Sequence, residues 1–193
     1  MSILIAPSQE TIDQFVGNAH GNLAMVKEIL EKYPSIIGAN ASWTETAIQA
    51  AAQTGQVEIV NYLIDHGAEY DICTAAMLGN IDCLEDFLAE DADMVNARGA
   101  HGIPLLYFAI IHAKRAAAEY LLQHGADPNA TSPVGITPLH GAVMFNQPKM
   151  AEWLLEHGAQ PNAKYDGKTA LAMAIEENRA ELVEILRSHG AVE

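Results

Sequence analysis

The feature that most constrains the fold of this chain is a short sequence element that recurs at a nearly constant spacing. Residues 121–130 read Leu-Leu-Gln-His-Gly-Ala-Asp-Pro-Asn-Ala and residues 154–163 read Leu-Leu-Glu-His-Gly-Ala-Gln-Pro-Asn-Ala, which sets Gly125 and Gly158 33 positions apart. A further copy contains Gly190, 32 positions later. A period of about 20–50 residues indicates a repeat architecture, in which each small unit buries its apolar face on its neighbours. We therefore expect a stack of similar units.

Degenerate copies of the element extend the pattern towards the N-terminus. Residues 62–68 carry the same motif, residues 87–92 are a copy with aspartate in place of glycine, and residues 29–34 are the most divergent copy. The equivalent positions are Tyr33, Gly67, Asp91, Gly125, Gly158 and Gly190. We expect a single domain over residues 8–193 with a cap at each end. Its six repeats are predicted at approximately 8–39, 40–70, 71–97, 98–130, 131–163 and 164–193.

Each repeat is expected to form two short helices. In the fifth repeat, Thr137 is suited to the N-cap and Pro138 to the first helical position, where a missing N–H costs nothing. A second helix follows with Trp153 and Leu154 on its apolar face. Gly158 can end this helix in the left-handed conformation. The sequence therefore predicts a helical hairpin in every repeat.

These motifs resemble the ankyrin repeat. The resemblance rests on the 33-residue period, on Thr-Pro-Leu-His at residues 137–140, on small pairs such as Ala51-Ala52, and on the ending Leu-Leu-x-His-Gly-Ala. It covers roughly residues 10–193. The resemblance implies an all-α solenoid of about six stacked helix-turn-helix units with short β-hairpin fingers. It also implies a scaffold that holds another protein.

Two repeats depart from the family pattern. The spacing from Gly67 to Asp91 is only 24 positions, so we expect the third repeat to lack its finger and to lead almost directly into its first helix. The fourth repeat has Ile103-Pro104-Leu105 where the fifth has Thr-Pro-Leu. Its first helix is therefore expected to begin differently.

The chain is strongly acidic, with 25 Asp and Glu residues against 10 Lys and Arg residues. This balance opposes attraction to nucleic acid or to an anionic membrane. Residues 1–7 lack the features of a signal peptide, and no stretch approaches the ~20 apolar residues of a membrane span. Two cysteines without a C-x-x-C spacing do not indicate a disulfide framework. We expect a soluble, cytoplasmic monomer that needs no cofactor.

A search for catalytic or metal-binding residues identifies no candidate. Neighbouring helices pack about 8–10 Å apart, whereas zinc holds imidazole nitrogens at about 2.0–2.1 Å, so histidines at equivalent repeat positions cannot share one metal ion. Such histidines near helix C-termini are expected to be structural, and they are His66, His124, His157 and His189. The resemblance implies that His140 braces neighbouring loops, and Cys73 and Cys83 are expected to be small buried hydrophobes. Motifs of metalloproteases, serine hydrolases and nucleotide-binding loops are absent.

Protein recognition is therefore the preferred function, through a concave groove and the fingers. The predicted binding residues are Trp43, Met77, Leu78, His101, Tyr107, Ile111, His112, Ser132, Val134, Met144, Phe145 and Tyr165. The alternative for these positions is that other parts of the chain cover them. Two other functions stay open: an inhibitor or immunity-type protein for a basic partner, and an enzyme with an unrecognised site. A basic partner would meet the acidic face formed by Asp82, Glu85, Asp86 and Glu90, although solubility explains these residues as well.

Overall fold

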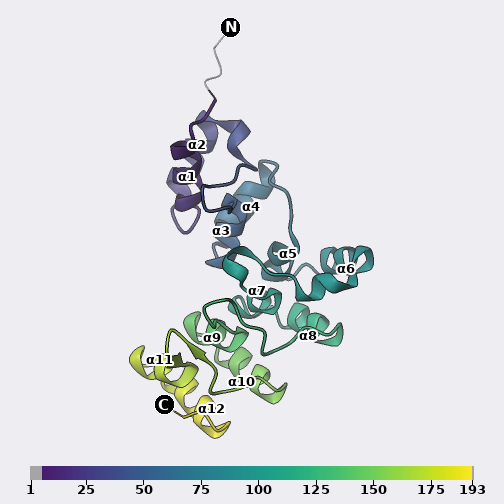
Figure 1. Cartoon of the computed structure of the whole chain (residues 1–193), viewed down its shortest axis with the longest axis vertical. Coiled ribbons are helices and arrows are strands. Elements are labelled where there is room, and N and C mark those ends of the chain that lie inside the picture. The colour runs from purple at the N-terminus through teal and green to yellow at the C-terminus, as the bar shows by residue number, and fades with distance from the viewer. Residues whose placement is uncertain (1–5, 193) are drawn as a thin grey trace. The chain divides into compact units, whose positions relative to one another are not determined.

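The computed structural model describes residues 6–192, and helical hairpins dominate this part of the chain (Figure 1). Along the chain the helices are α1 (Gln9–Asn18), α2 (Leu23–Lys32), α3 (Ala47–Gln53), α4 (Val57–Asp65), α5 (Ile72–Leu78), α6 (Ile81–Glu90), α7 (Leu105–Ile111), α8 (Arg115–Gln123), α9 (Pro138–Met144), α10 (Pro148–Glu156), α11 (Ala170–Glu176) and α12 (Ala180–Ser188). Successive helices pack together in the pairs α1–α2, α3–α4, α7–α8, α9–α10 and α11–α12. Short 3₁₀ turns lie at η1 (Pro34–Ile36), η2 (Ala92–Asn96) and η3 (Ala100–Gly102). The predicted all-α fold of repeated helix pairs is confirmed.

The chain forms two compact units, residues 1–74 and residues 75–193, and the boundary falls within α5. In the first unit, α1 packs on α3 and α2 packs on α4. In the second unit, α7 packs on α9 and α9 on α11, while α6 packs on α8 and α10 on α12. Within each compact unit, first helices therefore contact first helices and second helices contact second helices, as expected for stacked repeats.

The first helices α7 and α9 approach closely because Gly141 has no side chain. A Cβ atom added to Gly141 would lie 2.6 Å from two carbon atoms of the Tyr107 ring and 3.3 Å from Ile111 Cγ2. All seven residues of α7 are buried. The centre of the second compact unit is therefore packed to the density at which single methyl groups matter.

The helix ends follow the sequence signals. Thr46 and Thr137 each accept a hydrogen bond from the backbone N–H three residues later and form complete capping boxes, and Thr169 accepts the equivalent bond in the sixth repeat. Ser8 caps α1 in the same way. Gly158 has a φ of +89°, so it ends its repeat in the left-handed conformation. These predictions are confirmed.

The two departures from the family pattern are also confirmed. In the third repeat, α5 begins at Ile72, only a few residues after Gly67. In the fourth repeat, Pro104 stands at the N-cap of α7 in extended conformation and contributes no side-chain cap.

Sheet in the described part of the chain is confined to the fingers, as predicted for short hairpins. Within residues 6–192, the structure has a single strand pair, β1 (Lys164–Tyr165) with β2 (Lys168–Thr169), in the sixth repeat. Asp166 and Gly167 between them both have positive φ, which suits the two-residue turns whose twist matches a hairpin. The fingers of the second, fourth and fifth repeats are instead tight turns, closed by the backbone bonds Ala41 N–Glu45 O, Gly99 N–Ile103 O and Ser132 N–Ile136 O of 2.8, 2.9 and 2.9 Å.

Candidate protein-binding surface

Eight of the predicted binding residues present side-chain surface. Trp43, Val134 and Met144 are 42, 63 and 36% exposed. His101 is also exposed, and the half-buried residues are Leu78, His112, Phe145 and Tyr165. Trp43 lies in the first compact unit and the others lie in the second.

The prediction is wrong for four residues, because Met77, Tyr107, Ile111 and Ser132 are at most 4% exposed. Tyr107 and Ile111 lie in α7 against the backbone of α9 at Gly141. Ser132 turns inward, where its hydroxyl accepts a hydrogen bond of 3.1 Å from Ile136 N. Met77 lies in a part of α5 that is buried from Ile72 onwards. Residues at equivalent positions of different repeats therefore differ in exposure.

Phe145 extends the exposed apolar surface from α9 towards α7. Its ring centroid lies 6.4 Å from that of Tyr107, edge to face, and 6.4 Å from that of His112. Met144 precedes it at the C-terminal end of α9. His112 and Phe145, which are in ring contact, and Met144, which precedes Phe145 in the chain, form one patch, which we call the α9 patch.

Side chains of the following repeats hold the backbone under this patch in place. Gln147 Nε2 donates to Ile111 O at 3.0 Å. The Arg179 guanidinium donates to Val143 O and, at 3.1 Å, to Met144 O, and it pairs with Glu177. The patch is therefore presented on a fixed backbone, which lowers the entropy lost when a partner binds.

Met144→Ser tests the exposure of the α9 patch. We expect it to change the free energy of unfolding by no more than about 0.5 kcal/mol, since substitutions of exposed residues away from special features have small effects. Urea denaturation followed by circular dichroism measures the change, with Val192→Ser as a control because Val192 is 60% exposed. A much larger loss in Met144→Ser than in Val192→Ser would contradict the exposure of Met144.

The predicted acidic face is exposed throughout. Asp82, Glu85, Asp86 and Glu90 all lie on the solvent side of α6. Among the residues that the structure describes, none of these four carboxylates has a basic ion-pair partner. Asp82 lies in the first turn of α6, where the helix dipole favours an anion, but the last turn contains no basic residue.

The histidines at the repeat ends have the structural role that was predicted. In each of these histidines, Nδ1 lies 2.7–2.9 Å from the backbone carbonyl oxygen of the residue four positions earlier. The histidines are His66, His124, His157 and His189. The first three also pack against the aromatic ring four residues earlier, at centroid distances of 4.1, 4.1 and 4.5 Å. Across residues 6–192, no three His, Cys, Asp or Glu side chains gather as a metal site would require.

His140 braces the start of α9, as the family resemblance implied. Its Nδ1 lies 2.8 Å from Thr137 Oγ1 and 3.2 Å from Thr137 N. The residue is 1% exposed, and burial lowers the pKa of its imidazole. The folded chain therefore holds His140 neutral over a wider pH range than the unfolded chain does.

This lowered pKa predicts a loss of stability in acid. As the pH falls below about 6.5, unfolded His140 takes up a proton that the folded state does not, so the free energy of unfolding should decrease until the pH reaches the folded pKa. Urea denaturation of the wild type, His140→Gln and His157→Gln between about pH 5 and about pH 8 measures the dependence. We expect His140→Gln alone to weaken it. An unchanged pH dependence in that variant would contradict the assignment to His140.

A polar cluster that sequence reasoning missed positions Trp43. The Glu45 carboxylate is 2% exposed, and it accepts hydrogen bonds from Trp43 Nε1 at 2.7 Å and Gln53 Nε2 at 2.6 Å. His20 Nε2 lies 3.0 Å from Gln53 Nε2 and 3.7 Å from Glu45 Oε2. No local pattern marks these residues, because the turn after α1, the finger of the second repeat and α3 bring them together. The cluster fixes the indole edge of Trp43 and leaves part of its ring exposed.

Comparison with known proteins agrees with the repeat geometry. A family profile for three consecutive ankyrin repeats matches residues 106–192, and a profile for a single ankyrin repeat matches residues 45–75. The chain is 28% identical over 115 residues to alpha-latrocrustotoxin-Lt1a of Latrodectus tredecimguttatus. That match covers 55% of this chain but only 8% of the toxin. No helix in residues 6–192 has the length and apolar character needed to cross a membrane. With its capped helix pairs and matching profiles, the chain belongs to the ankyrin-repeat family.

Proposed function

We propose that this chain is a non-catalytic scaffold that binds a protein partner through the α9 patch and the exposed finger residues. Ankyrin repeats generally mediate protein–protein interaction, and they are typically non-catalytic modules. The observation that carries the proposal is the α9 patch itself, where Met144 and Phe145 expose apolar surface on a backbone tied by Gln147 and Arg179. Exposed apolar surface on a rigid frame favours binding, since burying it releases water at little entropic cost.

The test compares the partners that bind the wild type with those that bind two variants. Val134→Ser with Met144→Ser alters the proposed surface, and Val192→Ser alters an exposed valine at the last repeat. We expect affinity purification and mass spectrometry to identify a partner that the double variant loses and the control retains. Isolated proteins should then show at least a tenfold weaker affinity for the double variant. A partner that binds all three chains equally would contradict the proposed surface.

A second function, inhibition of a basic protein, rests on the unpaired carboxylates of α6. Clustered charge of one sign raises association rates with an oppositely charged partner, and this effect weakens as salt screens the charges. The screening length falls from about 10 Å at 0.1 M to about 3 Å at 1 M ionic strength. Association rates should therefore fall with salt for the wild type and depend less on salt after Asp82→Asn, Asp86→Asn and Glu90→Gln. Salt-insensitive rates for both proteins would leave the acidic face as a solubility device.

The acidic face also predicts a gain in stability. Asp86 stands four residues from both Asp82 and Glu90, and each such like-charge pair costs roughly 0.2–0.5 kcal/mol on a helix. We expect Asp86→Asn to raise the free energy of unfolding by about 0.4–1 kcal/mol at low salt. Thermal denaturation at low and high salt measures this, and Glu58→Gln on α4 serves as an exposed control, because no acidic residue stands three or four positions from Glu58. A gain that persists unchanged at 1 M salt would contradict the electrostatic explanation.

A further inference from the structure

An asparagine ties together the loops that close successive repeats in the second compact unit. Asn129 Nδ2 donates to Gly158 O at 2.9 Å, and its Oδ1 accepts from Gln160 N at 2.7 Å. Asn162 makes the same pair of bonds to Gly190 O at 3.2 Å and from Val192 N at 2.8 Å. One primary carboxamide thus satisfies a backbone carbonyl and a backbone N–H two residues apart. We call this arrangement the amide latch.

In the first compact unit, glycine stands at the latch position. The fingers align the two positions. In the fifth repeat, Ser132 N donates the bond that closes the finger, and Asn129 stands three residues before it. In the second repeat, Ala41 N donates the equivalent bond, and Gly38 stands three residues before it. In the Asn129 latch, the bonded backbone groups are Gly158 O and Gln160 N. The equivalent groups in the first compact unit are Gly67 O and Glu69 N. Within residues 6–192, neither Gly67 O nor Glu69 N has a hydrogen-bond partner. The backbone half of the latch is therefore present without its amide.

A cavity occupies the place of the missing side chain. It has a volume of about 340 Å³, and Gly38, Gln49, Gly67, Ala68 and Glu69 are among the residues that line it. A Cβ atom on Gly38 would meet no other atom within 4 Å. The space next to the unpaired groups is therefore large enough for an amide and the carbon chain that carries it.

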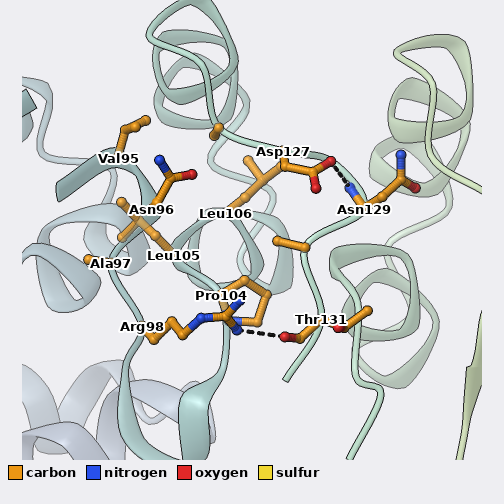
Figure 2. A pocket seen from close by; sticks show the side chains of 12 residues that line it. Val95, Asn96, Ala97, Arg98, Pro104, Leu105, Leu106, Asp127, Asn129 and Thr131 are labelled. Carbon is orange, nitrogen blue, oxygen red and sulfur yellow. Dashed lines mark hydrogen bonds between the residues drawn. The ribbon is translucent and has the colours of Figure 1, made fainter. Parts of the chain in front are cut away.

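The equivalent place between the third and fourth repeats is also open. Figure 2 shows Asn96 and Asp127 beside a pocket of about 290 Å³, with no bond between them. Asn96 stands 33 positions before Asn129, but its side chain makes no hydrogen bond within the described residues. In the same view, Arg98 donates to Thr131 O at 2.5 Å, so the two loops are joined at another point. An open pocket therefore accompanies the unmade latch in both compact units.

We propose that the cavity at Gly38 binds a primary carboxamide from outside the chain, in the position that the Asn129 and Asn162 side chains fill in their own latches. In a partner protein, this group is the side chain of asparagine or glutamine. The group must donate to Gly67 O and accept from Glu69 N at once. A carboxylate has no donor, and an ammonium or guanidinium has no acceptor, so neither can replace both bonds. Glu69 and Asp71 also line the cavity and disfavour an anion.

The test uses small probes and does not depend on the α9 patch or on any protein partner. Acetamide and acetate have similar shapes but differ in the donor that Gly67 O requires. Titration of the ¹⁵N-labelled full chain, followed by backbone amide chemical shifts, should move the Glu69 signal at least tenfold more with acetamide than with acetate. A peptide with a single glutamine should bind at least tenfold more tightly than the same peptide with glutamate.

Two variants test whether acetamide binds at the latch position. Gly38→Asn supplies the missing latch, so it should abolish the response of Glu69 to acetamide. Asn129→Gly opens the latch of the fifth repeat, so the Gln160 amide should gain a response that the wild type lacks. If Gly38→Asn does not fold, the difference between acetamide and acetate at the Glu69 amide of the wild type decides the question, and the gain at Gln160 shows that an open latch binds the amide. Equal responses to acetamide and acetate, or no response at Glu69, would overturn the proposal and leave a cavity that holds water only.

Discussion

Ile111→Ala is expected to lower the free energy of unfolding by about 2–5 kcal/mol, as truncation of a large core side chain does. Ile111 stands at the repeat position that sequence reasoning assigned to the groove, yet it has no exposed surface. Its truncation leaves a cavity between α7 and α9 that the tightly packed Gly141 backbone cannot fill. Urea denaturation followed by circular dichroism measures the loss.

Met144→Ser is the matched control, because Met144 stands 33 positions later at the same place in the next repeat. The two substitutions remove similar side chains from equivalent positions, so they differ chiefly in burial. We expect a large loss for Ile111→Ala and almost none for Met144→Ser. Similar losses in the two variants would show that the two positions do not differ in burial.

Gly141→Ala is expected to destabilise the chain by about 1–3 kcal/mol, as overpacking of a well-filled core does. The added methyl group would lie 2.6 Å from the Tyr107 ring, so α7 and α9 must move apart or the ring must leave its position. In an open helix the same change would instead stabilise by roughly 0.5–1 kcal/mol.

Gly17→Ala in α1 provides that comparison. Gly17 is exposed, and a Cβ atom there would meet nothing within 4 Å. Thermal denaturation should therefore shift in opposite directions for the two glycines. A stabilising Gly141→Ala would mean that the first helices pack more loosely than the structure indicates.

Much of the fold could be predicted because its signals are local. Thr137 and Pro138 mark the start of α9, and Gly158 marks the end of its repeat, within a few residues of the groups they contact. The short spacing after Gly67 likewise predicted the missing finger. Such features depend on backbone conformation, which neighbouring residues largely determine.

The binding surface could be predicted only in part, because exposure depends on neighbouring repeats. Periodicity gives Ile111 and Met144 the same position, but α7 is buried on every side, whereas the end of α9 is not. The same limit applies to Asn96 and Asn129, where one residue type makes a latch in one place and none in the other. Long-range geometry, and not residue type, decides both cases.

The distribution of tryptophan has a practical consequence for studies of cooperativity. The chain has two tryptophans, and Trp43 belongs to the first compact unit while Trp153 belongs to the second. Trp43 is partly solvated, whereas Trp153 is 1% exposed, so their emission spectra should differ in the native state. Single-tryptophan variants with Phe at the other position thus give each compact unit its own fluorescent reporter. Repeat arrays can lose two-state behaviour. Coincident transitions of the two reporters would show that the chain unfolds cooperatively, and separate transitions would show that the two compact units unfold independently.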